Sequence, residues 1–284
     1  MAKRDDDDYP TTGHEWDGIR EYDKPMPRWW VWCFYATIVF AIGYTIAYPA
    51  WPGITGATQG VLGYSTRGAV AEDIARYEAQ NAGLISQINE TELSTILETP
   101  ELLQFANAGG AAVFRNNCSQ CHGAGAAGAM GYYPNLLDDD WLWGGEVEQI
   151  HQTIAHGIRW DEDWDTRLSM MPAFGVDGIL NDAEIEAVAD YVISLSSSPA
   201  AGTLGETLYL DNCAACHMDN GMGEVELGAP NLTDAIWLYG GDKASVVETI
   251  TYSRAGVMPA WADRLSEAEV KQVAVYVHSL GGGQ

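Results

Sequence analysis

Two segments of this chain share the pattern Cys-x-x-Cys-His, and they lie in register within an internal repeat. They read "FRNNCSQCHGAG" at 114–125 and "LYLDNCAACHMDNG" at 208–221. The surrounding "GAAVFRNNCSQCHG" matches "GETLYLDNCAACHM" at an offset of 95 residues, and "LNDAEIEAVADYVISL" matches "LSEAEVKQVAVYVHSL" at an offset of 85. Self-similarity at such a period predicts two copies of one small fold.

Each copy is expected to be all-helical. One helix leads into the cysteine motif, a middle helix lies near 146–156 or 242–252, and a final helix closes the copy. The final helices begin at Asn181 and Ser266, each with a glutamate three residues later, which is close to the capping-box pattern. Each final helix should also carry one apolar stripe, formed by Ile185, Val188, Ala189 and Val192 in the first copy and by Val270, Val273, Ala274 and Val277 in the second. Copies of this size bury small cores, and a large apolar cofactor would enlarge them.

The cysteine motif itself points to that cofactor. Residues i and i+3 share one face of a helix, so Cys118 and Cys121 can reach one flat ligand while His122 projects over its middle. A porphyrin with two vinyl groups fits, and this motif is the signal for covalent attachment of c-type haem. The second copy repeats it with Cys213, Cys216 and His217. The sequence therefore predicts two haem c groups, each with a histidine on the iron.

Other uses of the four cysteines leave parts of the repeated Cys-x-x-Cys-His motif unexplained. A zinc site shared by both motifs would leave the two histidines without a role. A redox dithiol needs no adjacent histidine, and disulfides across such tight loops would remove little chain entropy.

Each copy also offers a Met-Pro pair for the sixth position on iron, at Met171 and Met258. A thioether ligand raises the potential of a haem, as in electron-carrying cytochromes. Ligation by His156 is the alternative. Arg159 and Arg254 could pair haem propionates, or could be ordinary exposed arginines.

A run without charge precedes the repeat. Residues 29–51, "WWVWCFYATIVFAIGYTIAYPAW", would form a helix of about 35 Å, enough to cross a hydrocarbon core of roughly 30 Å. Aromatic residues at both ends suit the two interfaces. A buried core helix is the alternative, and the polar stretch before the run disfavours a cleaved signal peptide. One retained transmembrane helix is predicted.

Charge then orients the helix. Five basic residues precede the apolar run, namely Lys3, Arg4, Arg20, Lys24 and Arg28. The first basic residue after the run is Arg67. The positive-inside rule places the N-terminus in the cytoplasm and residues 52–284 outside. Five of the 14 basic and eight of the 40 acidic residues precede the run, which leaves nine against 32, or −23, outside. This charge excludes nucleic acid as a partner. It would attract a basic protein, or it could suit saline surroundings.

The predicted transmembrane helix, the two haem c motifs and the N-terminal block "GHEWDGIREYDKPMPRWW" together resemble the dihaem subunit (subunit III) of cbb3-type cytochrome c oxidase. The likeness covers nearly the whole chain. The expected fold is all-α, with one transmembrane helix followed by two tandem cytochrome c-like domains. The expected parts are a cytoplasmic segment 1–28, a transmembrane helix 29–51, a linker with a helical segment 52–106, and haem domains 107–198 and 199–284. Pro100 is expected to break the helical segment.

The resemblance implies a function and its setting. The subunit would accept electrons from a donor cytochrome c and pass them to the monohaem and catalytic subunits, and the catalytic subunit reduces oxygen and pumps protons. It would lie in the bacterial inner membrane, in contact with lipid, with its haem domains in the periplasm. No catalytic residue is expected in this chain. The alternatives are an independent membrane-anchored carrier and a dihaem peroxidase or dehydrogenase.

The resemblance also implies details of the sites. Carbonyl groups of Pro134 and Pro230 would orient the two haem histidines. The first copy carries an additional segment, "RWDEDWDT" at 159–166, before its methionine. Because the two loops are therefore unequal, the sequence leaves open whether Met171 and Met258 each serve their own haem or that of the neighbouring domain.

Overall fold

The computed structural model describes residues 10–281, and the chain divides into two compact units, residues 1–80 and 81–284. Most of the described chain is helical. Two of the basic residues used for orientation, Lys3 and Arg4, lie outside the described residues.

The first unit begins with a short β-hairpin, and the rest of the described chain has the mostly helical architecture expected from the sequence. Strand β1 (Thr11–Trp16) pairs antiparallel with β2 (Ile19–Tyr22). The two residues between them, Asp17 and Gly18, both have positive φ, at 47° and 83°. This is the backbone of the tight hairpin turn that Asp-Gly favours most strongly. The signal was present in the sequence as "EWDGIR".

Helix α1 (Arg28–Ala47) follows, and it is long and apolar enough to cross a membrane. None of its residues is buried within the protein. The helix ends four residues before the predicted limit at Trp51. Tyr48 takes an extended conformation (φ −114°, ψ 162°) because it precedes Pro49, and a residue before proline is disfavoured in helical conformation.

Three helices lead towards the first cysteine motif, namely α2 (Thr66–Glu90), α3 (Leu93–Glu98) and α4 (Pro100–Val113). Helix α2 begins in the first unit and ends in the second. The predicted break at Pro100 is confirmed, since proline occupies the first turn of α4. At the end of α2, Lys271 donates to the carbonyl oxygens of Ile88, Asn89 and Thr91 at 3.2, 2.7 and 3.1 Å.

The two repeat copies contain the expected helices. In the first copy they are the π-helix η2 (Phe114–Cys118), α5 (Ser119–His122), α6 (Val147–His156) and α7 (Asp182–Leu195). In the second copy they are α8 (Leu204–Asn212), α9 (Ala214–His217), the 3₁₀ turn η3 (Val225–Leu227), α10 (Lys243–Tyr252) and α11 (Glu267–His278). Both predicted capping boxes, at Asn181 and Ser266, are present.

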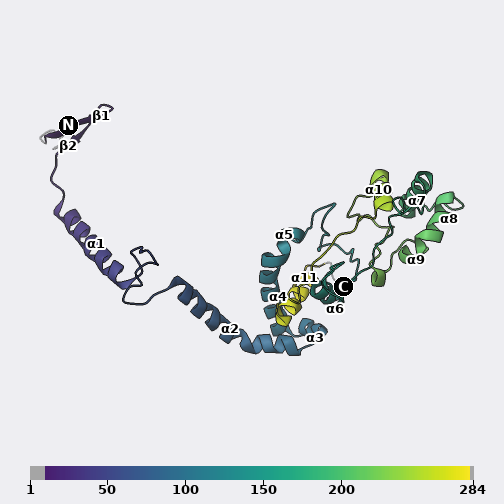
Figure 1. Ribbon diagram of the computed structural model, residues 1–284, viewed down its shortest axis with the longest axis horizontal. Coiled ribbons are helices and arrows are strands. Elements are labelled where there is room, and N and C mark those ends of the chain that lie inside the picture. The colour runs from purple at the N-terminus through teal and green to yellow at the C-terminus, as the bar shows by residue number, and fades with distance from the viewer. Residues whose placement is uncertain (1–9, 282–284) are drawn as a thin grey trace, which may run out of the picture. The chain divides into compact units, whose positions relative to one another are not determined.

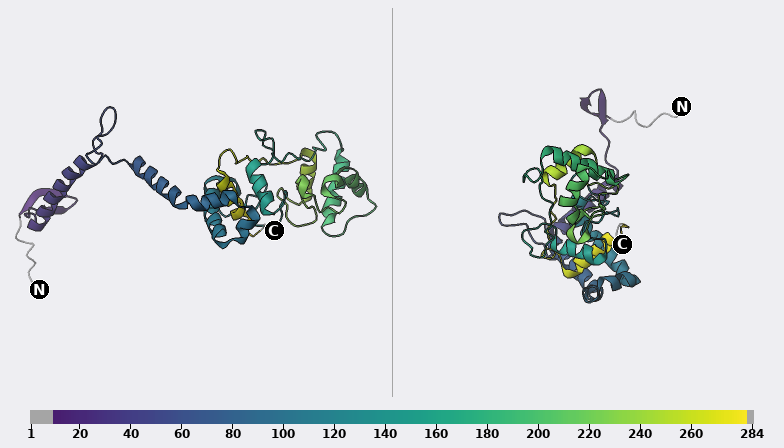
Figure 2. Two further views of the ribbon diagram at one scale, coloured as in Figure 1. Left: turned by 90° about the horizontal axis from the view of Figure 1, so that it is seen from below. Right: turned by 90° about the vertical axis from the view of Figure 1, so that its right-hand side faces the viewer.

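The closing helices, however, are exchanged between the copies. Helix α11 of the second copy packs on α4 and α6, whereas α7 of the first copy packs on α8 and α10. Figures 1 and 2 show this arrangement, with yellow α11 against α4 at one end and α7 among the green helices at the other. The consecutive domain boundaries 107–198 and 199–284 stay a prediction about the sequence repeat, since the packing follows a different division.

Two apolar clusters result. We call the first the Cys118 core, because Cys118 packs against it; it consists of Val113, Phe114, Ala126, Ile150, Ile154, Ala155, Val270, Val273, Ala274 and Val277. We call the second the Cys213 core; it contains Phe174, Leu180, Ile185, Val188, Ala189, Tyr191, Val192, Leu195, Tyr209, Cys213, Val246 and Ile250. The predicted apolar stripes of α7 and α11 are buried, each in the core of the other copy's cysteine motif.

Equivalent glycines make both helix crossings possible. A Cβ atom on Gly110 of α4 would collide with the backbone carbonyl of Gln272 in α11, and one on Gly205 of α8 with that of Ala187 in α7. Gly110 and Gly205 align at the repeat offset of 95, and Ala187 and Gln272 align at 85. Backbone therefore approaches backbone at corresponding points of the two crossings.

The loops after the two cysteine motifs also meet. The Gly131 amide donates to the Leu238 carbonyl at 2.7 Å. Nearby, the half-buried Asp140 has its pKa raised to about 6, first by desolvation and then by repulsion from Asp234, Asp138 and Asp139. Asp140 thus adds a negative charge close to those of Asp138, Asp139 and Asp234, which belong to the same two loops.

Substituting the crossing glycine should loosen the closing helix. Gly110→Ala adds only the Cβ atom that meets Gln272, and overpacking of this kind costs about 1–3 kcal/mol. We expect a lower thermal midpoint and faster proteolysis between α10 and α11. Gly83→Ala is the matched control, because nothing lies within 4 Å of that Cβ position and alanine is the better helix former. Equal midpoints for the two variants would contradict the crossing.

Asp140→Asn should stabilise the protein in a pH-dependent way. The folded-state pKa of about 6 lies above the ordinary value of about 3.9, so the folded chain binds the proton more tightly. The stability of the native protein therefore falls as pH rises from about 4 to about 6. The variant should raise the midpoint at pH 7.5 and change it little at pH 4. The same gain from Asp139→Asn, at the exposed neighbouring position, would argue against this account.

Candidate haem-binding sites

The first site is formed at the end of a widened helix. The π-helical turn η2 carries Cys118 against the Cys118 core, and α5 then presents Cys121 and His122. Burial raises the pKa of the Cys118 thiol to about 11, whereas Cys121 is exposed. A buried thiol of high pKa is a poor thiolate nucleophile, so the structure does not favour a redox dithiol here.

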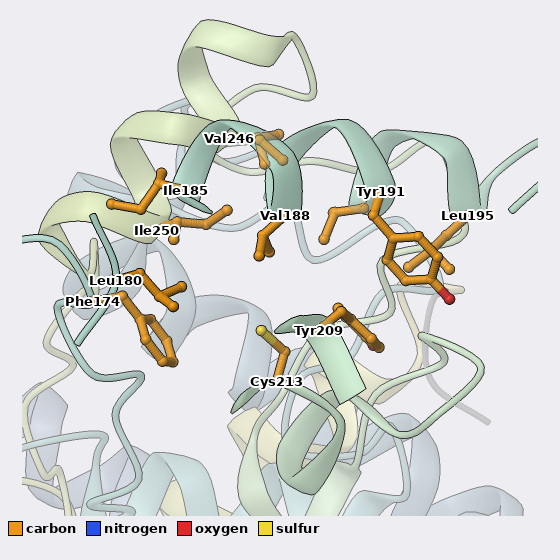
Figure 3. Packing of buried hydrophobic residues seen from close by; sticks show 12 residues of the cluster. Phe174, Leu180, Ile185, Val188, Tyr191, Leu195, Tyr209, Cys213, Val246 and Ile250 are labelled. Atoms are coloured by element: carbon orange, nitrogen blue, oxygen red, sulfur yellow. The ribbon is translucent and has the colours of Figure 1, made fainter. Parts of the chain in front are cut away.

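The second site has the same construction on α8 and α9. Cys213 is buried, its pKa is raised to about 11 by desolvation, and Cys216 is exposed. Figure 3 shows the Cys213 sulfur pointing towards the space framed by Phe174, Leu180 and Val188. These three side chains come from the first copy and belong to the Cys213 core. A thiol aimed at an apolar wall suits a porphyrin edge.

Each histidine is held by a proline carbonyl. The distance from His122 Nδ1 to the Pro134 oxygen is 3.3 Å, and that from His217 Nδ1 to the Pro230 oxygen is 3.0 Å. These hydrogen bonds are the ones that the resemblance implied. A carbonyl accepts the proton of Nδ1, so Nε2 retains its lone pair for a metal. Burial lowers the pKa of both imidazoles, which favours the neutral, ligating form.

The two methionines lie with the opposite motifs. Met258, from the second copy, packs against the Cys118 core, and Met171, from the first copy, packs against the Cys213 core. Both are half-buried, whereas the other methionines of the two repeat copies are exposed. These are Met130, Met170, Met218 and Met222.

Backbone hydrogen bonds fix this placement at equivalent points. After Met258, the Trp261 amide donates to the Ile154 carbonyl at 3.1 Å; after Met171, the Phe174 amide donates to the Ile250 carbonyl at 3.1 Å. Met258 also exchanges two hydrogen bonds with Ile158, at 2.9 and 3.0 Å. Each methionine segment is therefore docked on the middle helix of the other copy.

The remaining candidates have other partners. His156 Nδ1 lies 3.1 Å from Asp163 in the additional segment, so that ring nitrogen is already engaged. Arg254 donates to the Tyr239 and Ser245 carbonyls and to Glu248. Pairing of Arg159 or Arg254 with propionates stays a prediction. Sequence reasoning did not identify the apolar wall of Phe174 and Leu180, although "MPAF" and "MPAW" placed Phe174 beside a ligand candidate.

Comparison with known proteins covers both parts of the chain. Residues 9–55 match the model of the N-terminal domain of cytochrome oxidase-cbb3, FixP, and residues 105–192 and 200–277 match that of cytochrome c oxidase, cbb3-type, subunit III. The chain is 58% identical over 278 residues to the cbb3-type cytochrome c oxidase subunit CcoP of Cereibacter sphaeroides, covering 97% of this chain and 96% of that protein.

Two further relatives agree. Subunit FixP of Rhizobium meliloti is 52% identical over 277 residues, which is 96% of this chain and 95% of the relative. Subunit CcoP of Rhodobacter capsulatus is 50% identical over 286 residues, which is 96% of each chain. The two family models together cover the hairpin, the apolar helix and both cysteine motifs. The chain belongs to the CcoP/FixP family, subunit III of cbb3-type cytochrome c oxidase, and is an electron-transfer subunit with two cytochrome c domains that bind c-type haem.

Proposed function

We propose that the chain holds two haem c groups whose sixth ligands are exchanged between the repeat copies. Cys118 and Cys121 would hold the first haem covalently, and His122 and Met258 would bind its iron. Cys213 and Cys216 would hold the second, and His217 and Met171 would bind its iron.

The exchanged docking of the methionine segments is the observation that supports this assignment. Met258 packs on the core that also contacts Cys118, and Met171 on the core that contains Cys213. Each core includes the closing helix of the other copy. A ligand from the same copy would require each segment to leave the middle helix with which its backbone is paired. The unequal loops that left the question open in the sequence are thus accommodated by the crossing.

In this arrangement the residues bind and orient the two haem groups, and they transfer no proton and break no bond. When bound, haem iron supplies one-electron transfer between its two oxidation states. The protein surrounds each group with an apolar core, holds each imidazole through a proline carbonyl, and provides a thioether that favours the reduced state. The chain relays electrons from a donor cytochrome c to the monohaem and catalytic subunits. The charge of −23 outside the membrane would speed the approach of a basic donor.

The membrane arrangement follows from α1. With Arg20 and Lys24 before it, Arg28 at its first position and no further basic residue until Arg67, α1 is a single-pass anchor in the bacterial inner membrane. The hairpin β1–β2 then faces the cytoplasm, and the haem domains face the periplasm.

The ligand exchange can be tested in chains that carry one covalent haem. In a Cys213→Ser/Cys216→Ser background only the first site is loaded. There, Met258→His should abolish the red charge-transfer band of methionine-ligated ferric haem and lower the potential by on the order of a tenth of a volt or more, within the roughly 0.8 V that axial ligands span. Met171→His should leave both properties unchanged.

The reciprocal background provides the control. In a Cys118→Ser/Cys121→Ser chain the roles must reverse, so that Met171→His removes the band and Met258→His does not. If each histidine variant instead alters the haem of its own copy, the exchange is refuted while methionine ligation itself stands.

Membrane orientation is tested with alkaline phosphatase, which is active only after export. Inserted into the full-length chain after residue 65, beyond α1, the enzyme should be active, and inserted after Lys24, with α1 still present downstream, it should be inactive, because the positive-inside rule retains the N-terminal side. The opposite pattern would reverse the proposed topology.

A further inference from the structure

The additional segment of the first copy, residues 159–166, begins with an unusual backbone conformation. Arg159 has a φ of +51°, a region that residues with a side chain rarely occupy. Such a conformation persists only where the surrounding structure fixes it, and it often accompanies a functional constraint. The conformation of Arg159 therefore indicates that its side chain is held in a defined position.

The backbone around Arg159 is well fixed. Its amide donates to the Arg167 carbonyl at 2.8 Å, and the preceding residue, Ile158, is paired with Met258. Within the segment, the Trp160 amide donates to Thr166 Oγ1 at 3.1 Å. The segment is therefore a closed loop whose base lies beside the Met258 segment.

The guanidinium group contacts both methionine segments. Arg159 Nε donates to the carbonyl of Gly256 at 2.7 Å, and Nη1 donates to the carbonyl of Ser169 at 2.9 Å. Gly256 lies two residues before Met258, and Ser169 lies two residues before Met171. One planar fork of donors thus joins the two segments that approach the two haem sites. The side chain is half-buried, and desolvation lowers the pKa of its guanidinium.

The neighbouring arginines make different contacts. Arg167 donates to Thr153, to Gln152 and to the Gln149 carbonyl, all on α6. The hydrogen bonds of Arg254 described above go to α10 and Tyr239. Ser253, in contrast, donates its hydroxyl to the Met171 carbonyl, so it supports one methionine segment.

We propose that Arg159 is a positioning residue shared by both haem sites, tying the Met171 and Met258 segments together so that the two sixth ligands are placed jointly. This inference rests on the exchanged ligation proposed above. A lysine is a poor replacement at this position, because its donors all lie on one terminal nitrogen, whereas Arg159 reaches the two carbonyls from two different nitrogens of a rigid plane, Nε and Nη1. Both sites should therefore respond to one substitution, although the two cysteine motifs lie 95 residues apart.

Arg159→Lys in the assembled oxidase is the test, with each single-haem background used to read one site at a time. We expect the red charge-transfer band to weaken and the potential to shift at both haems. Ser253→Ala is the matched comparison and should affect only the haem of His217. A change at one haem alone in Arg159→Lys, or at neither, would overturn the proposal.

Two further measurements distinguish a failure of the ligand assignment from a failure of the proposed role of Arg159. If wild-type protein lacks the methionine band at either haem, the ligand assignment fails, whatever the effect of Arg159. If Arg159→Lys does not assemble, hydrogen exchange in the wild-type oxidase decides the matter. Amides of 169–171 and 256–258 should then open together, and protection that differs by about tenfold or more would show that no common clamp holds them.

Discussion

The haem-binding part of this protein depends on two helix crossings at which backbone touches backbone. Gly110 lies on the Gln272 carbonyl, and Gly205 lies on that of Ala187. Side chains larger than hydrogen would separate α4 from α11 and α8 from α7. Because these crossings join helices from different copies, they bring the opposite Met-Pro segment to each cysteine motif. The iron ligands proposed here are thus a consequence of helix packing.

Local sequence signals predicted most of the secondary structure. The caps at Asn181 and Ser266, the break at Pro100 and the apolar stripes of α7 and α11 all depend on neighbours within a few residues, and all are present. The Asp17-Gly18 turn is equally local, because Asp-Gly is by itself a strong signal for a two-residue hairpin turn. The cysteine motifs identified the cofactor class for the same reason, since their chemistry is contained in five consecutive residues.

Local sequence signals could not predict the exchange of the closing helices between the two copies. Two copies with matching stripes offer two ways of pairing opening and closing helices, and the apolar pattern of α7 suits α4 as well as α8. What distinguishes the pairings is the path of the connecting chain, including residues 159–166, and a path is a property of the whole unit. The repeat therefore predicted which residues would be ligands, while their partners emerged only from the three-dimensional packing.

The exchanged closing helices also determine the order in which the parts can be completed during synthesis. The Cys213 core draws on residues 174–250, so it is complete as soon as α10 has been made. The Cys118 core appears earlier in the chain but needs Val270 to Val277. The core whose cysteine motif is made first must wait for the last helix. A chain that ended before α11 would leave the Cys213 core whole and the Cys118 core open.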